Sequence, residues 1–267
     1  MTRRLSVVGL GPGRADWCLP AAADRLATAT DLVGYGPYLD LIAVPTVGRR
    51  HPSGNRVEAD RAAFALDLAA GGADVAVVSS GDPGIFAMAA AVFEQVELDP
   101  PRWSGIDIEV IPGVTAAQAA AARIGASLGH DFCTISLSDV LKPWEVVERR
   151  IEAAAGADFV LAFYNPISRH RPWQLGRALE IVRCHRDGAT PVVVARQVGR
   201  PDEEVHVVEL GRLVPDDVDM RTVLVIGSST TRTVAVNGRE VVYTPRRYAG
   251  SLDSALVVPA VVGRPAI

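Results

Sequence analysis

Short runs of β-branched residues alternate with alanine-rich stretches along most of this chain, and that order restricts the fold more than any other feature. The run at 75–78 (Val-Ala-Val-Val) is too short for a helix, and such runs are typical of strands that are buried on both faces of a sheet. Strands that alternate with helices are the units of parallel sheets. The sequence therefore predicts an α/β fold.

The predicted elements fall into two series. The first has strands at 5–8, 32–34, 75–78 and 106–111, with helices at 20–29, 57–70 and 85–96. The second has strands at 132–136, 159–163 and 192–196, with helices at 115–124, 144–155 and 173–183. Runs at 204–209 and 222–226 follow almost without a helical spacer, so we expect antiparallel strands there. We predict an N-terminal domain over 1–111, a C-terminal domain over 112–242, and an extension over 243–267.

Composition excludes several classes of protein. Of the 267 residues, 49% are apolar and 22% are charged, which is enough to bury the cores of two medium-sized domains. A net charge of −4 argues against general affinity for nucleic acid. The three cysteines are far apart, so they form neither a disulfide framework nor a metal-ligand set. No apolar run reaches membrane-spanning length and no signal-peptide core is visible, so we expect a cytoplasmic protein. Because the sequence offers no metal-ligand set, we expect no bound metal.

Three predicted strands end in glycine-bearing loops, and this repetition indicates ligand binding. The loops are Gly-Leu-Gly-Pro-Gly at 9–13, Ser-Ser-Gly-Asp-Pro-Gly-Ile-Phe at 79–86, and Pro-Gly-Val-Thr-Ala at 112–116. In open α/β sheets, ligands bind at the carboxyl ends of the strands. Three loops of small residues with a single carboxylate favour one large, flat ligand that contacts mostly main chain.

Each loop also has a simpler interpretation. The first loop lacks the dinucleotide fingerprint, since Arg14 stands where a glycine is needed and Pro12 removes a backbone donor. The simpler interpretation of that loop is a tight turn with no ligand. Asp82 is either a turn-forming Asx residue or a partner of the sulfonium and amino end of a zwitterionic cofactor. Thr115 is suited both to cap the following helix and to lie beside a ligand.

The order of these motifs resembles the tetrapyrrole methylase family. The resemblance covers residues from about 4 to 250. Further motifs strengthen the resemblance to the members that act on precorrin-3B, namely Ser-Leu-Ser-Asp at 136–139, Lys-Pro-Trp-Glu at 142–145, Phe-Tyr-Asn-Pro at 163–166 and Ser-Arg-His-Arg at 168–171. The resemblance implies two αβα domains with the active-site cleft between them, a homodimer, and S-adenosyl-L-methionine as cofactor. It also implies methylation of precorrin-3B at C-17 with ring contraction to precorrin-4, a step of cobalamin biosynthesis.

The resemblance also implies which residues contact the cofactor. Those at close motif matches are Pro12, Ser80, Gly81, Asp82, Ile85, Thr115 and Ala116, and those at looser matches are Asn165, Val198 and Thr222. Many relatives place methionine at the position of Asn165. A contact through the backbone is therefore still expected there, whereas asparagine has no thioether group to offer.

Ring contraction needs a proton acceptor, and the substrate carries many carboxylates. Candidate bases are His51, His130, Asp139 and His170, each of which also suits a turn, a cap or a surface ion pair. Candidate carboxylate-binding residues lie in two basic segments that we expect to be loops, Arg49, Arg50 and Arg56 in one and Arg169 and Arg171 in the other. A solvated charged surface is the alternative for each segment.

Three other functions remain open at this point. A cobalt-containing substrate of the anaerobic route, cobalt-factor III, is compatible with the same motifs. A ribosomal-RNA or diphthamide-type methyltransferase fits the acidic balance poorly. A non-catalytic tetrapyrrole-binding protein would have no need for three cofactor loops.

Overall fold

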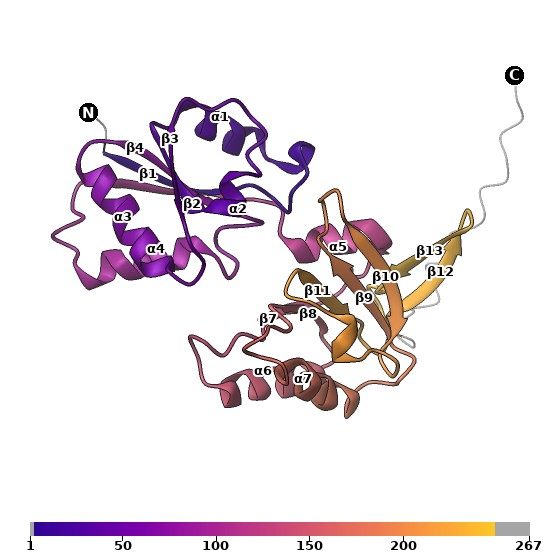
Figure 1. Ribbon diagram of the computed structural model, residues 1–267. Helices are drawn as coiled ribbons and strands as arrows, with labels where there is room; N and C mark the ends of the chain where they lie inside the picture. Colours follow the sequence, from indigo (N-terminus) through magenta and orange to yellow (C-terminus); the bar gives the residue numbers. More distant parts are fainter. Residues whose placement is uncertain (1–2, 249–267) are drawn as a thin grey trace, which may run out of the picture.

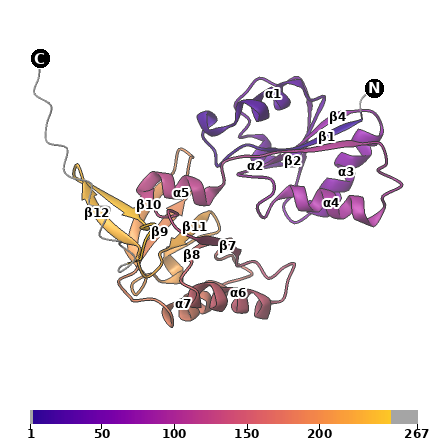
Figure 2. The same ribbon diagram turned by 180° about the vertical axis from the view of Figure 1, so that it is seen from behind.

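The computed structural model describes residues 3–248 and arranges them in two five-stranded sheets and one three-stranded sheet. Figures 1 and 2 show the two larger sheets in two neighbouring units, the first formed by the N-terminal part of the chain. Helix α5 (Ala116–Ile124) lies where the two units meet. In the part of the chain that the structure describes, no helix is both long enough and apolar enough to cross a membrane.

The first sheet is entirely parallel, with the order β3-β2-β4-β1-β5. Its strands are β1 (Arg4–Gly9), β2 (Asp31–Tyr35), β3 (Arg49–Ser53), β4 (Asp74–Ser79) and β5 (Asp107–Ile111). Helices α1 (Pro20–Thr28) and α2 (Gly36–Leu39) cover one face, and α3 (Glu58–Ala70) and α4 (Met88–Leu98) cover the other. Successive residues of β4 alternate between the two cores, which explains its continuous apolar run.

The second sheet is mixed, with the order β10-β9-β11-β8-β7. Its strands are β7 (Phe132–Ser136), β8 (Val160–Tyr164), β9 (Pro191–Arg196), β10 (Glu204–Glu209) and β11 (Thr222–Ile226). As predicted, β10 and β11 run antiparallel to their neighbours. Helices α6 (Trp144–Gly156) and α7 (Gln174–Arg183) cover one face, and α5 packs on the other. The α/β fold with two αβα units agrees with the sequence-based expectation.

A small third sheet was not predicted. It has the order β12-β13-β6, with β6 (Gly125–Ala126), β12 (Arg232–Val236) and β13 (Arg239–Tyr243). Asn237 and Gly238 join the hairpin with φ angles of 50° and 74°, and an Asn-Gly pair between apolar runs is a strong hairpin signal. The predicted extension over 243–267 begins at Tyr243, the last residue of β13, and 249–267 lie outside the described residues.

Two further expectations need correction. Arg49, Arg50 and His51 were expected in a loop, but they belong to β3, the edge strand of the first sheet. Its sequence, Arg-Arg-His-Pro-Ser, lacks the β-branched residues that mark a buried strand, because an edge strand is exposed to solvent. Helix α4 begins at Met88 rather than at 85, since the chain first turns through Phe86, whose φ is 52°.

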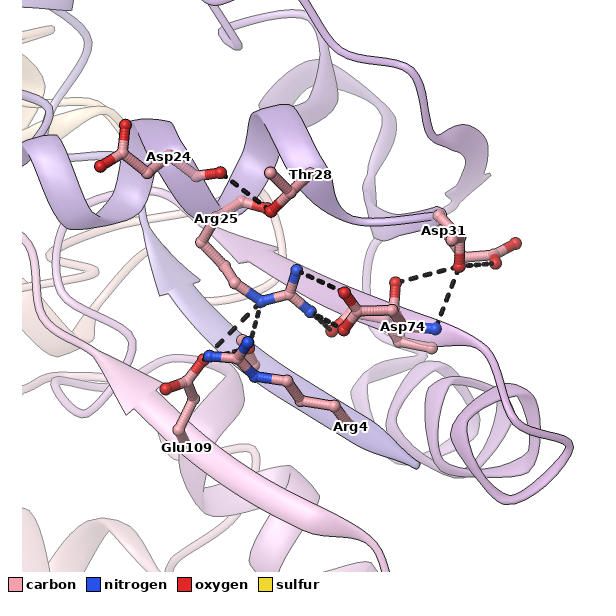
Figure 3. A network of polar contacts seen from close by, with 10 residues as sticks. Arg4, Asp24, Arg25, Thr28, Asp31, Asp74 and Glu109 are labelled. Carbon is pink, nitrogen blue, oxygen red and sulfur yellow. Dashed lines mark hydrogen bonds and ion pairs between the residues drawn. The ribbon is translucent and has the colours of Figure 1, made fainter. Parts of the chain in front are cut away.

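A buried arginine joins α1 to the amino-terminal half of the first sheet (Figure 3). The Arg25 side chain is only 4% exposed and forms an ion pair with Asp74, while its Nε donates to Ser6 Oγ at 2.6 Å. Glu109 lies 3.7 Å from the same Nε and pairs with Arg4 at 2.6 Å. Burial opposes ionisation of Glu109, but the hydrogen bonds from Ser6 and Arg4 outweigh it and lower the pKa of the carboxyl group.

Replacement of this arginine is expected to destabilise the fold strongly. Arg25→Met removes the cation that lies between two carboxylates, and loss of one partner of a buried ion pair costs about 3 kcal/mol. Urea denaturation measures the change in the free energy of unfolding. Arg212→Met is the matched control, because that exposed arginine pairs only across a surface turn and its loss should cost less than about 1 kcal/mol. Equal effects of the two substitutions would contradict the assignment.

Candidate active site

The three glycine loops meet at the carboxyl edge of the first sheet, as the sequence predicts. Gly11 and Gly81 exchange two backbone hydrogen bonds, of 3.1 and 2.7 Å. A Cβ on Gly113 would lie 2.2 Å from the carbonyl oxygen of Gly81, and a Cβ on Gly9 would lie 2.7 Å from the same atom. Because these atoms belong to backbone that cannot move aside, glycine is required at both positions.

Asp82 ties the second loop to the third. Its Oδ1 accepts a hydrogen bond of 2.8 Å from the backbone N–H of Gly84, and its Oδ2 accepts one of 3.0 Å from that of Gly113. The first bond confirms the Asx-turn interpretation. The second holds a negative charge at the point where the loops converge, so the turn interpretation and a role beside a ligand are compatible.

Thr115 stands at the N-cap position of α5, but it does not cap the helix through its side chain. That part of the prediction was wrong. Thr115 Oγ1 lies 2.6 Å from the hydroxyl of Tyr164, and the same phenol oxygen accepts a hydrogen bond of 2.9 Å from the backbone N–H of Ala117. Burial raises the pKa of Tyr164. Sequence reasoning missed this residue, although it lies in the Phe-Tyr-Asn-Pro motif.

The second sheet contributes an edge of its own. Strand register pairs Ser136 with Tyr164 and Thr222 with Arg196, so the carboxyl ends of β7, β8 and β9 share one edge with the start of β11. The predicted cofactor residues Asn165, Val198 and Thr222 therefore lie along this edge. Thr222 is buried, and its hydroxyl donates to Asp219 at 3.0 Å; Val198 is buried among the apolar residues beneath α5.

The backbone conformation at Asn165 favours asparagine. Its φ is 52°, in the left-handed region, which asparagine tolerates better than most residues. Its Nδ2 donates to Ser136 Oγ at 3.0 Å. The side chain thus joins two strand ends of the second sheet.

The two edges face each other and touch. Pro12 packs on Gly199, where an added Cβ would lie 3.1 Å from the proline Cγ, and Arg200 Nε donates to the Pro12 carbonyl at 3.3 Å. The ring of Phe86 lies 5.4 Å from that of Tyr164. Ser80 and Ile85 lie in the second loop, and Ala116 begins α5 directly after the third loop.

The geometry at the junction fits a ligand held by main chain. A Cβ on Gly81 would make ordinary van der Waals contacts, the nearest with Thr115 Cα at 3.9 Å, so the second and third loops lie close together there without overlap. The loops offer backbone groups, small side chains and the single carboxylate of Asp82. These groups suit a zwitterionic molecule that has an apolar body and a positive centre. Among the described residues, no group of three or more His, Cys, Asp and Glu side chains could hold a metal ion.

The candidate bases separate into two groups. Asp139 and His170 lie on loops that follow β7 and β8, at the edge that faces the first sheet. Asp139 accepts a hydrogen bond of 2.9 Å from Gln174 Nε2, and His170 is exposed.

His51 and His130 lie elsewhere. His51 is in the middle of β3, where its Nε2 is 2.7 Å from Asp31 Oδ1 and its ring packs on Phe64. His130 precedes β7, at the amino end of that strand, and its Nδ1 accepts the backbone N–H of Asp131 at 2.7 Å. The structure brings neither of them to the glycine loops.

The candidate carboxylate-binding arginines are also divided. Arg56 follows β3 at its carboxyl end and is exposed, as is Arg169 on the loop after β8. Arg49 and Arg50 are within β3, and Arg50 donates to the Leu39 carbonyl at 3.1 Å.

Arg171 differs from the other arginines because it is 7% exposed. Its Nη1 donates to the carbonyls of Leu137 at 3.2 Å and Asn165 at 2.8 Å. Burial lowers the pKa of Arg171; the negative charge of Asp139 opposes this shift, and the positive charge of Arg56 adds to it. Much of its guanidinium is therefore used to hold its own loops.

Comparison with known proteins places the fold and these loops in a family. Residues 4–214 match the family model for Tetrapyrrole (Corrin/Porphyrin) Methylases. The chain belongs to the tetrapyrrole methylase family.

Two relatives within this family are each 52% identical to the chain over 252 residues. One is the precorrin-3B C(17)-methyltransferase of Sinorhizobium sp, with 94% of this chain and 99% of the relative covered. The other is the cobalamin biosynthesis protein CobIJ of Mycobacterium tuberculosis, with 93% of this chain covered; the chain spans about half, 49%, of the length of that relative. A crystal structure of the methyltransferase CobJ is 50% identical, with a TM-score of 0.85, covering 90% of this chain and 99% of that one.

Substitution at the loop junction is expected to destabilise the protein. In Gly113→Ala the new methyl group would overlap the Gly81 carbonyl, and such overpacking costs about 1–3 kcal/mol. Gly54→Ala is the control, because an added Cβ there would meet nothing within 4 Å and its φ is ordinary, so a change of less than about 0.5 kcal/mol is expected. Thermal and urea denaturation measure both variants. An unchanged stability of Gly113→Ala would show that the loops separate more easily than their contacts indicate.

Proposed function

We propose that this chain is a methyltransferase of cobalamin biosynthesis that uses S-adenosyl-L-methionine to methylate precorrin-3B at C-17, with ring contraction to precorrin-4. Membership of the family and the high identity to a precorrin-3B C(17)-methyltransferase along nearly its whole length support this substrate. The structural observation that carries the proposal is the convergence of three glycine loops opposite the edge of a second sheet.

The cofactor would be held from both sides of the junction. Pro12, Ser80, Gly81, Asp82, Ile85, Thr115 and Ala116 would contact it from the first edge, and Asn165, Val198 and Thr222 from the second. When bound, the cofactor supplies an electrophilic methyl group on a sulfonium. The loops would hold that methyl group in line with the ring carbon at about 3 Å, which removes most of the entropic cost of the displacement.

Asp82 would provide the electrostatic part of cofactor binding. Two backbone N–H groups hold its carboxylate in place, so little reorganisation is needed when a positive group approaches. The rest of the loop junction is uncharged main chain. That combination favours a molecule with one localised positive end over a polyphosphate.

The substrate side of the site would use the exposed cations and a proton acceptor on the facing loops. Arg56 and Arg169 present guanidinium groups that pair with carboxylates in a bidentate fashion. Asp139 and His170 remain the candidates to accept the proton of the C-20 hydroxyl during ring contraction, because both lie on loops at the second edge. We also propose a cytoplasmic homodimer, in line with the family resemblance.

The decisive experiment is product analysis with the purified protein, precorrin-3B and S-adenosyl-L-methionine. A mass spectrum that shows one added methyl group, with an absorbance change from the contracted ring, supports the proposal. Turnover of cobalt-factor III but not of precorrin-3B would reassign the chain to the cobalt-containing substrate. Tight tetrapyrrole binding without turnover of either substrate would indicate a binding protein.

Replacement of Arg56 should weaken substrate binding selectively. Arg56→Asn keeps a residue that tolerates the φ of 63° but removes the guanidinium. Loss of one charge-assisted pair should raise the KM for precorrin-3B about tenfold. The KM for S-adenosyl-L-methionine should stay within about twofold, since the cofactor loops are unaltered.

Arg49→Asn is the matched comparison, because it removes the same guanidinium from β3, upstream of the carboxyl end of that strand. We expect its KM for precorrin-3B to change less than about twofold. Steady-state kinetics with each substrate varied in turn separate the two effects. A larger effect of Arg49→Asn than of Arg56→Asn would place the substrate beside β3 instead.

A further inference from the structure

The start of α5 depends on a residue that comes from the other sheet. Thr115 makes no capping bond, yet the buried N–H of Ala117 is satisfied, because the phenol oxygen of Tyr164 accepts it at 2.9 Å. With that N–H as donor, the phenol proton is free to bond Thr115 Oγ1, which lies 2.6 Å away. One hydroxyl therefore fixes residues on either side of Ala116.

Tyr164 also contacts the second glycine loop. It ends β8, and its ring lies 5.4 Å from that of Phe86, at an angle of 59° between the planes. Phe86 holds a φ of 52°, which is uncommon for a bulky residue, and its half-exposed ring packs on Tyr164. Tyr164 thus touches two of the three loops from the opposite side of the junction.

We propose that Tyr164 is a positioning residue, whose hydroxyl caps α5 and so sets the backbone of Thr115 and Ala116 for the cofactor. This inference rests on the proposed function, since it concerns the geometry of the same cofactor site. The proposed role of the Tyr164 hydroxyl is to form hydrogen bonds. The hydroxyl orders main chain and does not exchange a proton with the substrate, because both of its bonds are made within the protein.

The test compares Tyr164→Phe with the wild-type protein. The phenylalanine keeps the ring against Phe86 and removes only the two hydrogen bonds. We expect the Kd for S-adenosylhomocysteine, measured by calorimetry, to rise about tenfold, as the loss of two neutral hydrogen bonds implies. The KM for S-adenosyl-L-methionine should rise in parallel. At saturating cofactor and substrate, kcat should stay within about twofold and its pH profile should not move.

Tyr243→Phe is the matched control, because it removes a hydroxyl from β13, in the small sheet. Its Kd for S-adenosylhomocysteine should stay within about twofold of the wild-type value. Thr115→Val provides a second variant should Tyr164→Phe fail to fold. It keeps the bond from Ala117 to the phenol oxygen and removes the bond from the phenol hydroxyl to Thr115 Oγ1, so a rise of about threefold in Kd is expected.

The outcomes separate this inference from the proposed function. Wild-type protein that binds no S-adenosylhomocysteine would overturn the proposed function together with the inference. Wild-type binding with unchanged Kd values in Tyr164→Phe, or in Thr115→Val if it alone folds, would overturn the inference only. A fall in kcat with an altered pH profile and an unchanged Kd would also overturn it, because the hydroxyl would then act in proton transfer.

Discussion

The contact between the backbones of Gly9, Gly81 and Gly113 is the constraint on which the rest of the structure depends. A side chain at Gly9 or Gly113 would overlap the carbonyl oxygen of Gly81, so three strand ends can approach one another only as bare main chain. The edge that results presents amide and carbonyl groups in fixed positions. The one carboxylate of these loops, Asp82, is itself held by backbone N–H groups.

This constraint extends to the second sheet through α5. The third loop leads directly into this helix, whose residues Ala117, Ala119 and Ala120 are buried against Val160 and Val193. Small side chains allow the helix to lie close to the sheet, so the position of the loop and the position of the sheet are coupled. The contacts of Pro12 with Gly199 and of Thr115 with Tyr164 close the same junction from either side. Any movement of one sheet edge relative to the other would alter the shape of the ligand site.

Local signals made the alternation of strands and helices, the antiparallel end of the second sheet and the three converging loops predictable. Strand β3 could not be found in the same way, because this edge strand, Arg-Arg-His-Pro-Ser, carries neither a β-branched run nor alternation. The Asn237-Gly238 turn did carry a usable signal for the hairpin. Neither the separation of His51 from the site nor the capping role of Tyr164 could be predicted, since both depend on which strands are neighbours in space.

Arg171 shows why a basic motif alone does not identify a substrate contact. The left-handed turn at Asn165 leaves a carbonyl without a strand partner, and the end of β7 leaves another at Leu137. Buried carbonyl groups need donors, and one guanidinium supplies both from a single side chain. The Phe-Tyr-Asn-Pro and Ser-Arg-His-Arg motifs are therefore one structural unit. Arg171 thus orders the loop that carries the exposed side chains of Arg169 and His170.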